Sequence, residues 1–282
     1  MKLVLRMRGK PWWVRRMQFC SPAVELSSEE KLRRLVNAAL ATPYYSRPEH
    51  AARLLAAKHL QDLPVSSLRY VLDSIPGFVN PKVSAARSLF RPPFATGNCA
   101  LLGKKLRLPG GVREFDGAAF GRLHLSDTRM LAATPTVLRR ICAAIEARLL
   151  ALPQLCEAVV VLEGIEDGIL HAGERDLLWR ALGVPVFEQW LGLDGELLGW
   201  ECGAHRGLHF NSQKAALEEI DGELVITSWT ALRTPVLRMG TGLAAEIDQR
   251  VCPCGDARPL LRNIAIRSKS VGVLQTHALA GA

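Results

Sequence analysis

Two pairs of candidate metal ligands late in the chain constrain its fold more than any other feature of the sequence. Cys202 and His209 form the first pair, and Cys252 and Cys254 flank a single proline in the second. Three thiolates and one imidazole complete the tetrahedral shell of a structural zinc site, with no position left for water or substrate. Because the segment between the pairs is too long for a local zinc finger, the metal would join two separate loops of a larger domain.

Two alternatives remain open for these residues. Cysteine is often a small buried hydrophobe. Four of the seven cysteines fit that description, since each lies alone among apolar or unpatterned residues: Cys20, Cys99, Cys142 and Cys156. The tetrapeptide Cys-Pro-Cys-Gly at 252–255 differs from them because its turn aims two neighbouring sulfurs at one point. His205 is an alternative to His209 as the fourth ligand.

Composition indicates a packed domain in a reducing compartment. A chain of 282 residues with 49% hydrophobic residues can form one large domain or two small ones. No apolar run approaches the roughly 20 residues that cross a bilayer, so no membrane span is expected. The N-terminus lacks the apolar stretch and cleavage site of a secretory signal. With an odd number of cysteines, these features predict a cytoplasmic protein, where paired thiols more often bind metal than form disulfides.

The net charge of +9 is concentrated near the N-terminus. Residues 1–60 hold twelve Lys/Arg against four Glu, a surplus of eight, so the remainder is close to neutral. The basic N-terminal arm, residues 1–25, also carries Trp12 and Trp13. Such an arm suits nucleic acid, anionic lipid or a phosphorylated ligand, and it suits a solvated flank equally well. Because no nucleic-acid motif accompanies it, we favour the solvated flank and do not expect a nucleic-acid partner.

Local signals predict a helical segment over residues 26–95. Ser27 and Glu30 have the spacing of a capping box, which predicts a helix that ends near Pro43. A second helix is predicted over residues 48–59. Between residues 60 and 93, five prolines prevent any long element.

Residues 131–200 predict an α/β unit with parallel strands, because helices and strands alternate there. The expected elements are a helix that begins at Thr134-Pro135, a buried strand over 158–162, a helix over 173–182 ended by Gly183, and a strand over 184–187.

Residues 201–270 predict a smaller antiparallel β subdomain with the zinc clamp. Asp221-Gly222 is a two-residue turn signal between residues 216–220 and 223–229, which predicts a hairpin. Further strands are expected over 235–238 and 243–247. Residues 96–130 are left as a connecting segment and residues 271–282 as a tail. The predicted fold class is therefore α/β, a mixed sheet with flanking helices plus the smaller β subdomain.

Several motifs follow one another in a fixed order in the second half. They are residues 183–194 (GVPVFEQWLGLD), Glu201-Cys202, Gly207-Leu208-His209, residues 222–227 (GELVIT), residues 234–238 (TPVLR) and Cys252-Pro253-Cys254-Gly255. This order resembles the adenylate-forming enzymes, in particular the phenylacetate–CoA ligases and related capsule-biosynthesis proteins. The likeness covers residues 130–270, and more loosely 26–80, where Tyr44-Tyr45 looks like the end of the family's opening helix. In that branch the Cys, His and Cys-x-Cys positions bind zinc.

The resemblance implies the adenylate-forming N-terminal domain and activation of a small carboxylic acid, with ATP and Mg²⁺ and then CoA as cofactors. It places Trp190, Asp194, Arg238 and Thr241 in the nucleotide and magnesium region, which we call the nucleotide region. Asp194 stands where the family has its magnesium-facing acid, and Glu196 is a second candidate acid.

Departures from the family predict weak or absent adenylation by this chain alone. The nearest candidate for the Ser/Thr/Gly-rich phosphate loop, residues 95–97, has one hydroxyl and one glycine. Leu193 and Leu243 replace the threonine before the acid and the ribose-binding aspartate. The hinge motif has become Arg-Ser-Lys-Ser at 267–270 and the sequence stops soon after, so we expect the small domain with the catalytic lysine to be absent. Catalytic residues are therefore not assigned.

Three functions are consistent with these features. The first is a shortened, degenerate adenylate-forming relative, a pseudoenzyme, and we favour it for fold and ancestry while activity stays open. The second is a working ligase that binds nucleotide through Asp194, Thr241 and Lys104-Lys105. The third is a non-catalytic, zinc-stabilised binding protein that uses its basic N-terminal arm. Weaker polar candidates are the carboxylates Glu163, Glu166 and Asp167, which a solvated turn explains equally well, and His124 and His171, which we expect at the surface or at the edge of the core.

Overall fold

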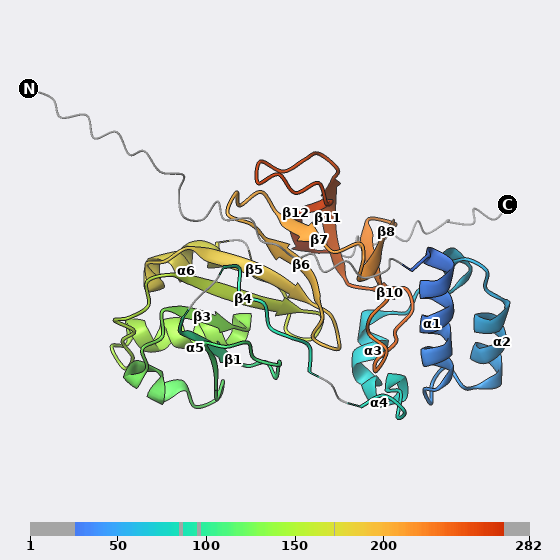
Figure 1. Cartoon of the computed structure of the whole chain (residues 1–282), viewed down its shortest axis with the longest axis horizontal. Helices are drawn as coiled ribbons and strands as arrows, with labels where there is room; N and C mark the ends of the chain where they lie inside the picture. Colours follow the sequence, from blue (N-terminus) through green and yellow to red (C-terminus); the bar gives the residue numbers. More distant parts are fainter. Residues whose placement is uncertain (1–25, 85–86, 95–96, 172, 268–282) are drawn as a thin grey trace, which may run out of the picture.

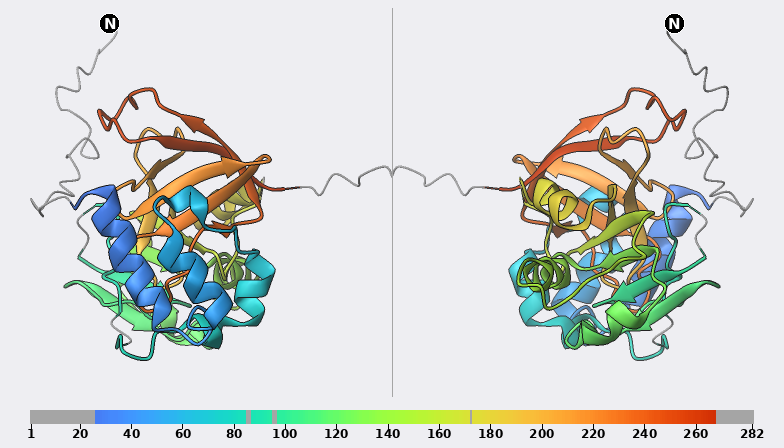
Figure 2. Two further views of the ribbon diagram at one scale, coloured as in Figure 1. Left: turned by 90° about the vertical axis from the view of Figure 1, so that its right-hand side faces the viewer. Right: turned by 90° about the vertical axis from the view of Figure 1, so that its left-hand side faces the viewer.

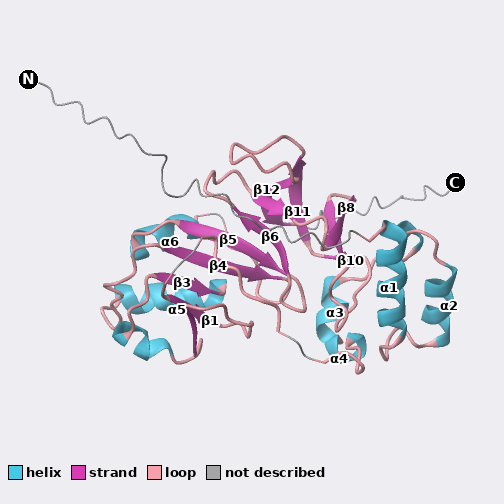
Figure 3. Ribbon diagram, viewed as in Figure 1, coloured by secondary structure: helices cyan, strands magenta, loops and turns pink. Residues whose placement is uncertain are grey.

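The computed structural model describes residues 26–84, 87–94, 97–171 and 173–267. The basic N-terminal arm, most of the candidate phosphate loop at 95–97, residues 268–270 of the hinge motif and the tail lie outside these ranges. No helix in the described ranges combines the length and the apolar character that a membrane crossing requires. Strands occupy the middle of the molecule, with helices at both ends (Figure 3).

The main sheet is mixed and contains nine of the strands found in the described ranges. Their bounds are β1 (Cys99–Leu102), β2 (Val112–Phe115), β3 (Met130–Ala133), β4 (Ala158–Gly164), β5 (Val186–Leu191), β6 (Leu197–Glu201), β7 (Leu208–Phe210), β11 (Leu243–Asp248) and β12 (Leu260–Ile266). The spatial order is β11-β12-β7-β6-β5-β4-β3-β1-β2. Neighbouring strands pair in parallel from β2 through β1, β3 and β4 to β5, and the pairing of β3, β4 and β5 is the parallel pairing predicted for the α/β unit. From β5 through β6, β7 and β12 to β11 the neighbours pair antiparallel.

Two helices cover one face of the parallel half of the sheet, α5 (Pro135–Glu146) and α6 (Glu174–Leu182). Leu138 and Ile141 of α5 pack on alternate residues of β4, Val159 and Val161, because successive strand side chains point to opposite faces. Thr134 is the N-cap of α5 by its extended backbone, although its hydroxyl makes no capping hydrogen bond. Ala158, Val160 and Leu162 of β4 face a second core that includes Trp200 and Phe90.

The N-terminal helices form a separate layer at the other end of the molecule (Figure 1). They are α1 (Ser28–Leu40), α2 (Pro48–Ala56), α3 (Leu68–Asp73) and α4 (Ile75–Phe78), with a 3₁₀ turn at Leu60–Asp62. A second 3₁₀ helix, Phe120–Leu125, belongs to the main-sheet half. In the left view of Figure 2, α1 and α2 face the viewer. The predicted capping box is present, since the Glu30 amide donates to Ser27 Oγ (3.2 Å) and the Ser27 amide donates to Glu30 Oε2 (2.8 Å).

The second helix is shorter than predicted, because it ends at Ala56 rather than at His59. The amides of Lys58 and His59 donate instead to the Asp62 carboxylate, at 2.9 and 2.8 Å, and so begin the following 3₁₀ turn. The four helices share a core with Leu237 and Met239 of the second half.

The small sheet has the order β10-β9-β8, with β8 (Ala215–Ile220), β9 (Glu223–Ser228) and β10 (Met239–Gly240). The predicted hairpin joins β8 to β9. Asp221 and Gly222 both have positive φ angles, 51° and 75°, which is the backbone of a type I′ turn.

Two expectations about strands need correction. Residues 235–238 are irregular and not a strand, because Arg238 has a φ of 43° and its guanidinium is bound within the protein. Within this part of the chain, pairing with β9 begins at Met239 and includes Gly240. Residues 96–130, expected to be a connecting segment, contain β1 and β2 of the main sheet. Strand β6 also crosses residue 200, so one continuous sheet joins the α/β unit to the β subdomain.

Candidate metal centre and nucleotide region

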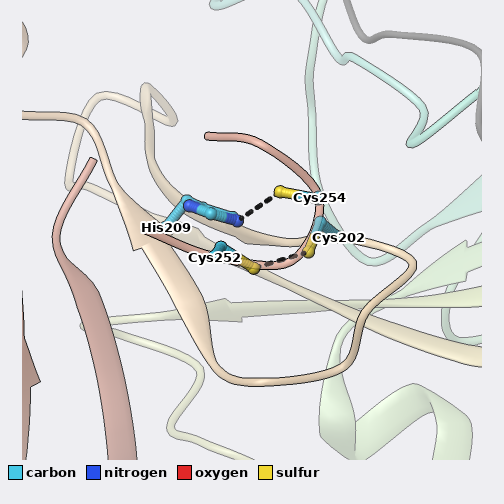
Figure 4. A group of neighbouring side chains, drawn as sticks. All are labelled: Cys202, His209, Cys252 and Cys254. Atoms are coloured by element: carbon cyan, nitrogen blue, oxygen red, sulfur yellow. Dashed lines mark hydrogen bonds between the residues drawn. The ribbon is translucent and has the colours of Figure 1, made fainter. Parts of the chain in front are cut away.

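The four predicted zinc ligands converge (Figure 4). The ligand atoms of Cys202, His209, Cys252 and Cys254 all lie within 4.8 Å of one another. Cys202 Sγ is 3.7 Å from Cys252 Sγ, and Cys254 Sγ is 3.3 Å from His209 Nε2. A tetrahedron with zinc–sulfur bonds of about 2.3 Å has sulfur atoms about 3.8 Å apart. The spacing of these atoms therefore fits a tetrahedral metal ion.

Strand pairing brings the two ligand pairs together. Cys202 follows the end of β6, and His209 lies in β7 opposite Trp200 of β6 on one side and Leu260 of β12 on the other. Cys252 and Cys254 lie in the loop between β11 and β12. A tight turn there has the Gly255 amide donating to the Cys252 carbonyl at 2.8 Å, with Gly255 at a φ of 87°. The antiparallel order β6-β7-β12-β11 thus places ligands from distant segments at one point.

The surroundings of His209 fit the neutral, metal-binding form of the ring. The side chain is buried, and burial lowers the pKa of the imidazole, so it is neutral at physiological pH. Its buried Nδ1 lacks a hydrogen-bond partner and lies 3.9 Å from Asp256 Oδ2. A carboxylate on that side favours a proton on Nδ1, which leaves the Nε2 lone pair directed at the sulfurs.

Asp256 and Trp200 are held by the same arginine. Arg258 pairs with the Asp256 carboxylate at 2.8 Å and stacks over the Trp200 ring, 4.4 Å from its centroid. Burial raises the pKa of the Cys202 thiol to about 12. A divalent cation reverses this effect, because a coordinating thiol is deprotonated by the metal.

His205, the alternative fourth ligand, belongs to a different group. Its Nδ1 lies 2.8 Å from Glu201 Oε1, and Glu201 in turn receives Arg175 Nη2 at 2.6 Å. Arg175 also binds Glu188 at 2.6 Å through Nη1. Burial, followed by repulsion from Glu201, raises the pKa of Glu188. This network was not predicted from the sequence, where its only signal is an acid, Glu188, directly after the strand predicted over 184–187.

Three residues of the nucleotide region, Asp194, Arg238 and Thr241, form hydrogen bonds within the protein, although Asp194 Oδ1 is buried without a partner. Asp194 Oδ2 accepts the backbone amides of Arg233 and Thr234 at 3.0 and 3.2 Å. Thr241 Oγ1 donates to the Leu224 carbonyl at 2.8 Å. Trp190, 1% exposed, packs in a core that is shared by strands of the main sheet and the small sheet.

All three guanidinium nitrogens of Arg238 donate hydrogen bonds within the protein. Its Nε and Nη2 donate to the two oxygens of Glu218 at 3.0 and 3.1 Å, and Nη1 donates to the carbonyls of Gln61 and Leu63. It therefore ties the N-terminal helical layer to the hairpin.

The space at the carboxyl ends of β4 and β5 is small. A cavity of about 10 Å³ lies there, and its lining includes Ile165, Gly192, Leu193 and Glu196. That volume is enough for about one water molecule. Glu196 is deeply buried, and burial raises its pKa to about 7. Its Oε2 accepts the Asp194 amide at 3.0 Å, whereas Glu196 Oε1 and Asp194 Oδ1 are buried without a hydrogen-bond partner.

The three carboxylates at the end of β4 do not form one cluster. Asp167 and Glu166 pair with Lys104, whose Nζ lies 2.6 and 3.3 Å from their oxygens. Glu163 points elsewhere and accepts the Leu170 amide at 2.6 Å. His124 and His171 lie at the surface, as expected.

Comparison with known proteins gives results at the level of structure alone. No protein-family model and no curated protein sequence matches the chain. A solved structure of 2-hydroxyisobutyryl-CoA ligase, in an open conformation with 2-HIB-AMP and CoA, superposes with a TM-score of 0.60 at 16% identity, over 84% of this chain and 69% of the ligase. The same ligase in the postadenylation state with R3-HIB-AMP gives 0.58 at 15% identity, over 86% and 71%. The chain has the fold of the adenylate-forming enzymes.

The adenylate-forming fold confirms both the family resemblance expected from the motifs and the predicted mixed α/β architecture. A third structure of the ligase, in the thioesterification state with 2-HIB-AMP and CoA, agrees, with a TM-score of 0.57 at 16% identity over 85% of this chain and 69% of the ligase. Identities this low establish the fold alone.

Proposed function

We propose that this protein is a zinc-clamped relative of the acyl-CoA ligases that does not adenylate a carboxylic acid on its own. The observation that carries the proposal is the cavity of about 10 Å³ at the carboxyl ends of β4 and β5, beside the turn that holds Asp194 of the nucleotide region. Pockets that bury small-molecule ligands have volumes of about 300–1,000 Å³. The space here is too small by more than an order of magnitude.

The side chains around that space support the same conclusion. Adenylation requires groups that stabilise charge on the phosphates and anchors that hold the ribose. Asp194 has one oxygen occupied by two backbone amides, and Leu193 and Leu243 offer no polar atom. Lys104 is neutralised by Asp167 and Glu166. ATP, Mg²⁺ and CoA are therefore ligands of this protein only if the region opens around them.

Zinc at the Cys202, His209, Cys252 and Cys254 centre has a structural role in this proposal. Four protein ligands fill a tetrahedral shell, so the ion supplies a cross-link and no open coordination position. The cross-link joins the loop after β6 to the turn between β11 and β12. It therefore fixes the end of the main sheet that is formed by β6, β7, β12 and β11.

ATP–pyrophosphate exchange tests the proposal. The zinc-loaded full chain is incubated with Mg²⁺-ATP, labelled pyrophosphate and a panel of aryl and aliphatic acids, beside an active acyl-CoA ligase as a positive control. We expect no exchange above background with any acid. Robust exchange that Asp194→Asn abolishes would refute the proposal and favour a working ligase that uses this acid. Calorimetric titration with Mg²⁺-ATP provides an independent measurement, in which we expect no saturable heat.

A further inference from the structure

The three cysteines of the metal centre differ in their exposure to solvent. Cys202 and Cys252 are buried, with 4% and 3% of their surfaces exposed, whereas Cys254 is exposed. All three sulfurs lie within 4.8 Å of one another, and the buried pair is 3.7 Å apart. A solvent-exposed cysteine beside a second thiol that can resolve it is the arrangement found at reversible oxidation sites.

We propose that this centre is an oxidation site, in which a peroxide reacts at Cys254, a disulfide forms between Cys202 and the Cys-Pro-Cys turn, and the metal is released. The inference rests on the proposed metal at these residues. It adds a chemical reaction to a centre whose proposed role is otherwise structural.

The reaction balances with a peroxide as the only oxidant. The Cys254 sulfur attacks one peroxide oxygen, the O–O bond breaks, and the sulfur becomes a sulfenic acid while a proton from solvent completes one water. The Cys202 thiolate then attacks the sulfenic sulfur. An S–S bond forms, the S–O bond breaks, and the leaving hydroxide takes a second proton to give another water. Two thiolates, one hydrogen peroxide and two protons thus give one disulfide and two waters.

The disulfide is expected across the two loops and not within the turn. Cys252 and Cys254 are separated by one proline, and backbone hydrogen bonds from the Cys252 amide to Asp256 (3.1 Å) and from the Gly255 amide to Cys252 (2.8 Å) fix that turn. Cys202 comes from the other loop, and its sulfur is 3.7 Å from that of Cys252. Thiol exchange can therefore transfer the disulfide of Cys202 from Cys254 to Cys252, and in either form the two loops stay linked.

The protein keeps its fold while the reaction proceeds. Strands β7 and β12 pair at His209 with Leu260 and at Leu208 with Leu261, and this backbone pairing joins the two strands in addition to the metal. After the disulfide forms, His209 and one thiol remain as ligands. Two ligands are too few for a tetrahedral zinc site, so the ion is lost.

The experiment uses full-length protein purified under reducing conditions and loaded with zinc, with the metal content measured first. Hydrogen peroxide is added in equimolar steps, and a chromogenic chelator reports released zinc. We expect one zinc released for every two thiols lost, and both the thiols and the zinc-binding capacity restored by dithiothreitol. Non-reducing peptide mass spectrometry should show Cys202 linked to the peptide that carries Cys252 and Cys254.

Two variants sharpen the test. Cys156→Ser removes an exposed thiol outside the centre and should leave the rate of zinc release unchanged. Cys254→His replaces the exposed sulfur with another zinc ligand and should slow zinc release by roughly tenfold, because the accessible thiolate is gone. The peptide map of the unmodified chain decides the question even if that variant does not fold.

The outcomes separate the two proposals. A preparation that holds no zinc before peroxide refutes the metal centre and, with it, the oxidation site. A zinc-loaded preparation that retains its metal, or loses thiols without a Cys202 cross-link, refutes the oxidation site and leaves the metal centre standing.

Discussion

Arg238→Met separates a structural arginine from a nucleotide ligand. Arg238 and its partner Glu218 have side chains only 11% and 16% exposed, and two of the arginine nitrogens grip the two carboxylate oxygens. The third nitrogen serves the carbonyls of Gln61 and Leu63 in the N-terminal layer. Methionine fills a similar volume but donates no hydrogen bond.

The expected loss in the free energy of unfolding follows from the groups that lose their hydrogen-bond or ion-pair partner. Removing one member of a buried ion pair costs about 3–5 kcal/mol, and a buried acceptor left without a donor costs about 1–3 kcal/mol. Because Glu218 retains some contact with water, we take the lower part of this range and expect a loss of about 3 kcal/mol in the free energy of unfolding. For a domain of this size that corresponds to a fall of roughly 6–12 °C in Tm.

Urea denaturation followed by tryptophan fluorescence measures the loss. Arg33→Met is the control, since the Arg33–Glu29 pair is 66% and 83% exposed, and it should change stability by less than about 0.5 kcal/mol. Adding Glu218→Gln to Arg238→Met should recover about 1 kcal/mol, because the unpaired charge is removed. An Arg238→Met variant that is as stable as the original chain but binds nucleotide more weakly would contradict the structural role and indicate that Arg238 is a nucleotide ligand.

Three further predictions concern single residues. Burial raises the pKa of Glu196 to about 7 from 4.5, so the native protein binds a proton that the unfolded chain releases, and stability falls as pH rises from 4.5 to 7. Glu196→Gln should therefore gain about 3 kcal/mol at pH 8 and change little at pH 4, and an unchanged pH profile in urea denaturation would contradict this. Asp256→Asn should weaken zinc binding by about 10–100-fold in a chelator competition, since the carboxylate no longer orients His209, whereas equal affinity would remove Asp256 from the centre. Gly222→Ala should cost about 1 kcal/mol because its φ is 75°, while the control Gly110→Ala, where an added Cβ meets no atom, should be neutral; equal effects would argue against the type I′ turn.

Local signals in the sequence predicted local structure. The Ser27 capping box and the Asp221-Gly222 turn are both present, because each depends on backbone geometry within a few residues. The proline after Thr134 marked the start of α5 for the same reason. The convergence of Cys202, His209, Cys252 and Cys254 was also predictable, since ligand type and the tight Cys-Pro-Cys turn restrict what such residues can do.

Features that depend on distant contacts were not predictable. Strands β1 and β2 have four residues each and lie among glycines and basic residues, so only their place in the sheet reveals them. The irregular backbone at Arg238 follows from partners as far away as Gln61. The network around Arg175 joins α6, β5 and β6, and no spacing along the sequence reports a contact of that kind.

We propose that one zinc ion joins the loop after β6 to the turn between β11 and β12. Elemental analysis combined with zinc X-ray absorption of the purified chain tests it most directly. We expect one zinc per chain with three sulfur ligands and one nitrogen ligand, and a stoichiometric loss of metal in Cys252→Ala but not in Cys156→Ala. Protein that stays folded and metal-free in the presence of zinc, or a bound ion without sulfur ligands, would contradict the claim.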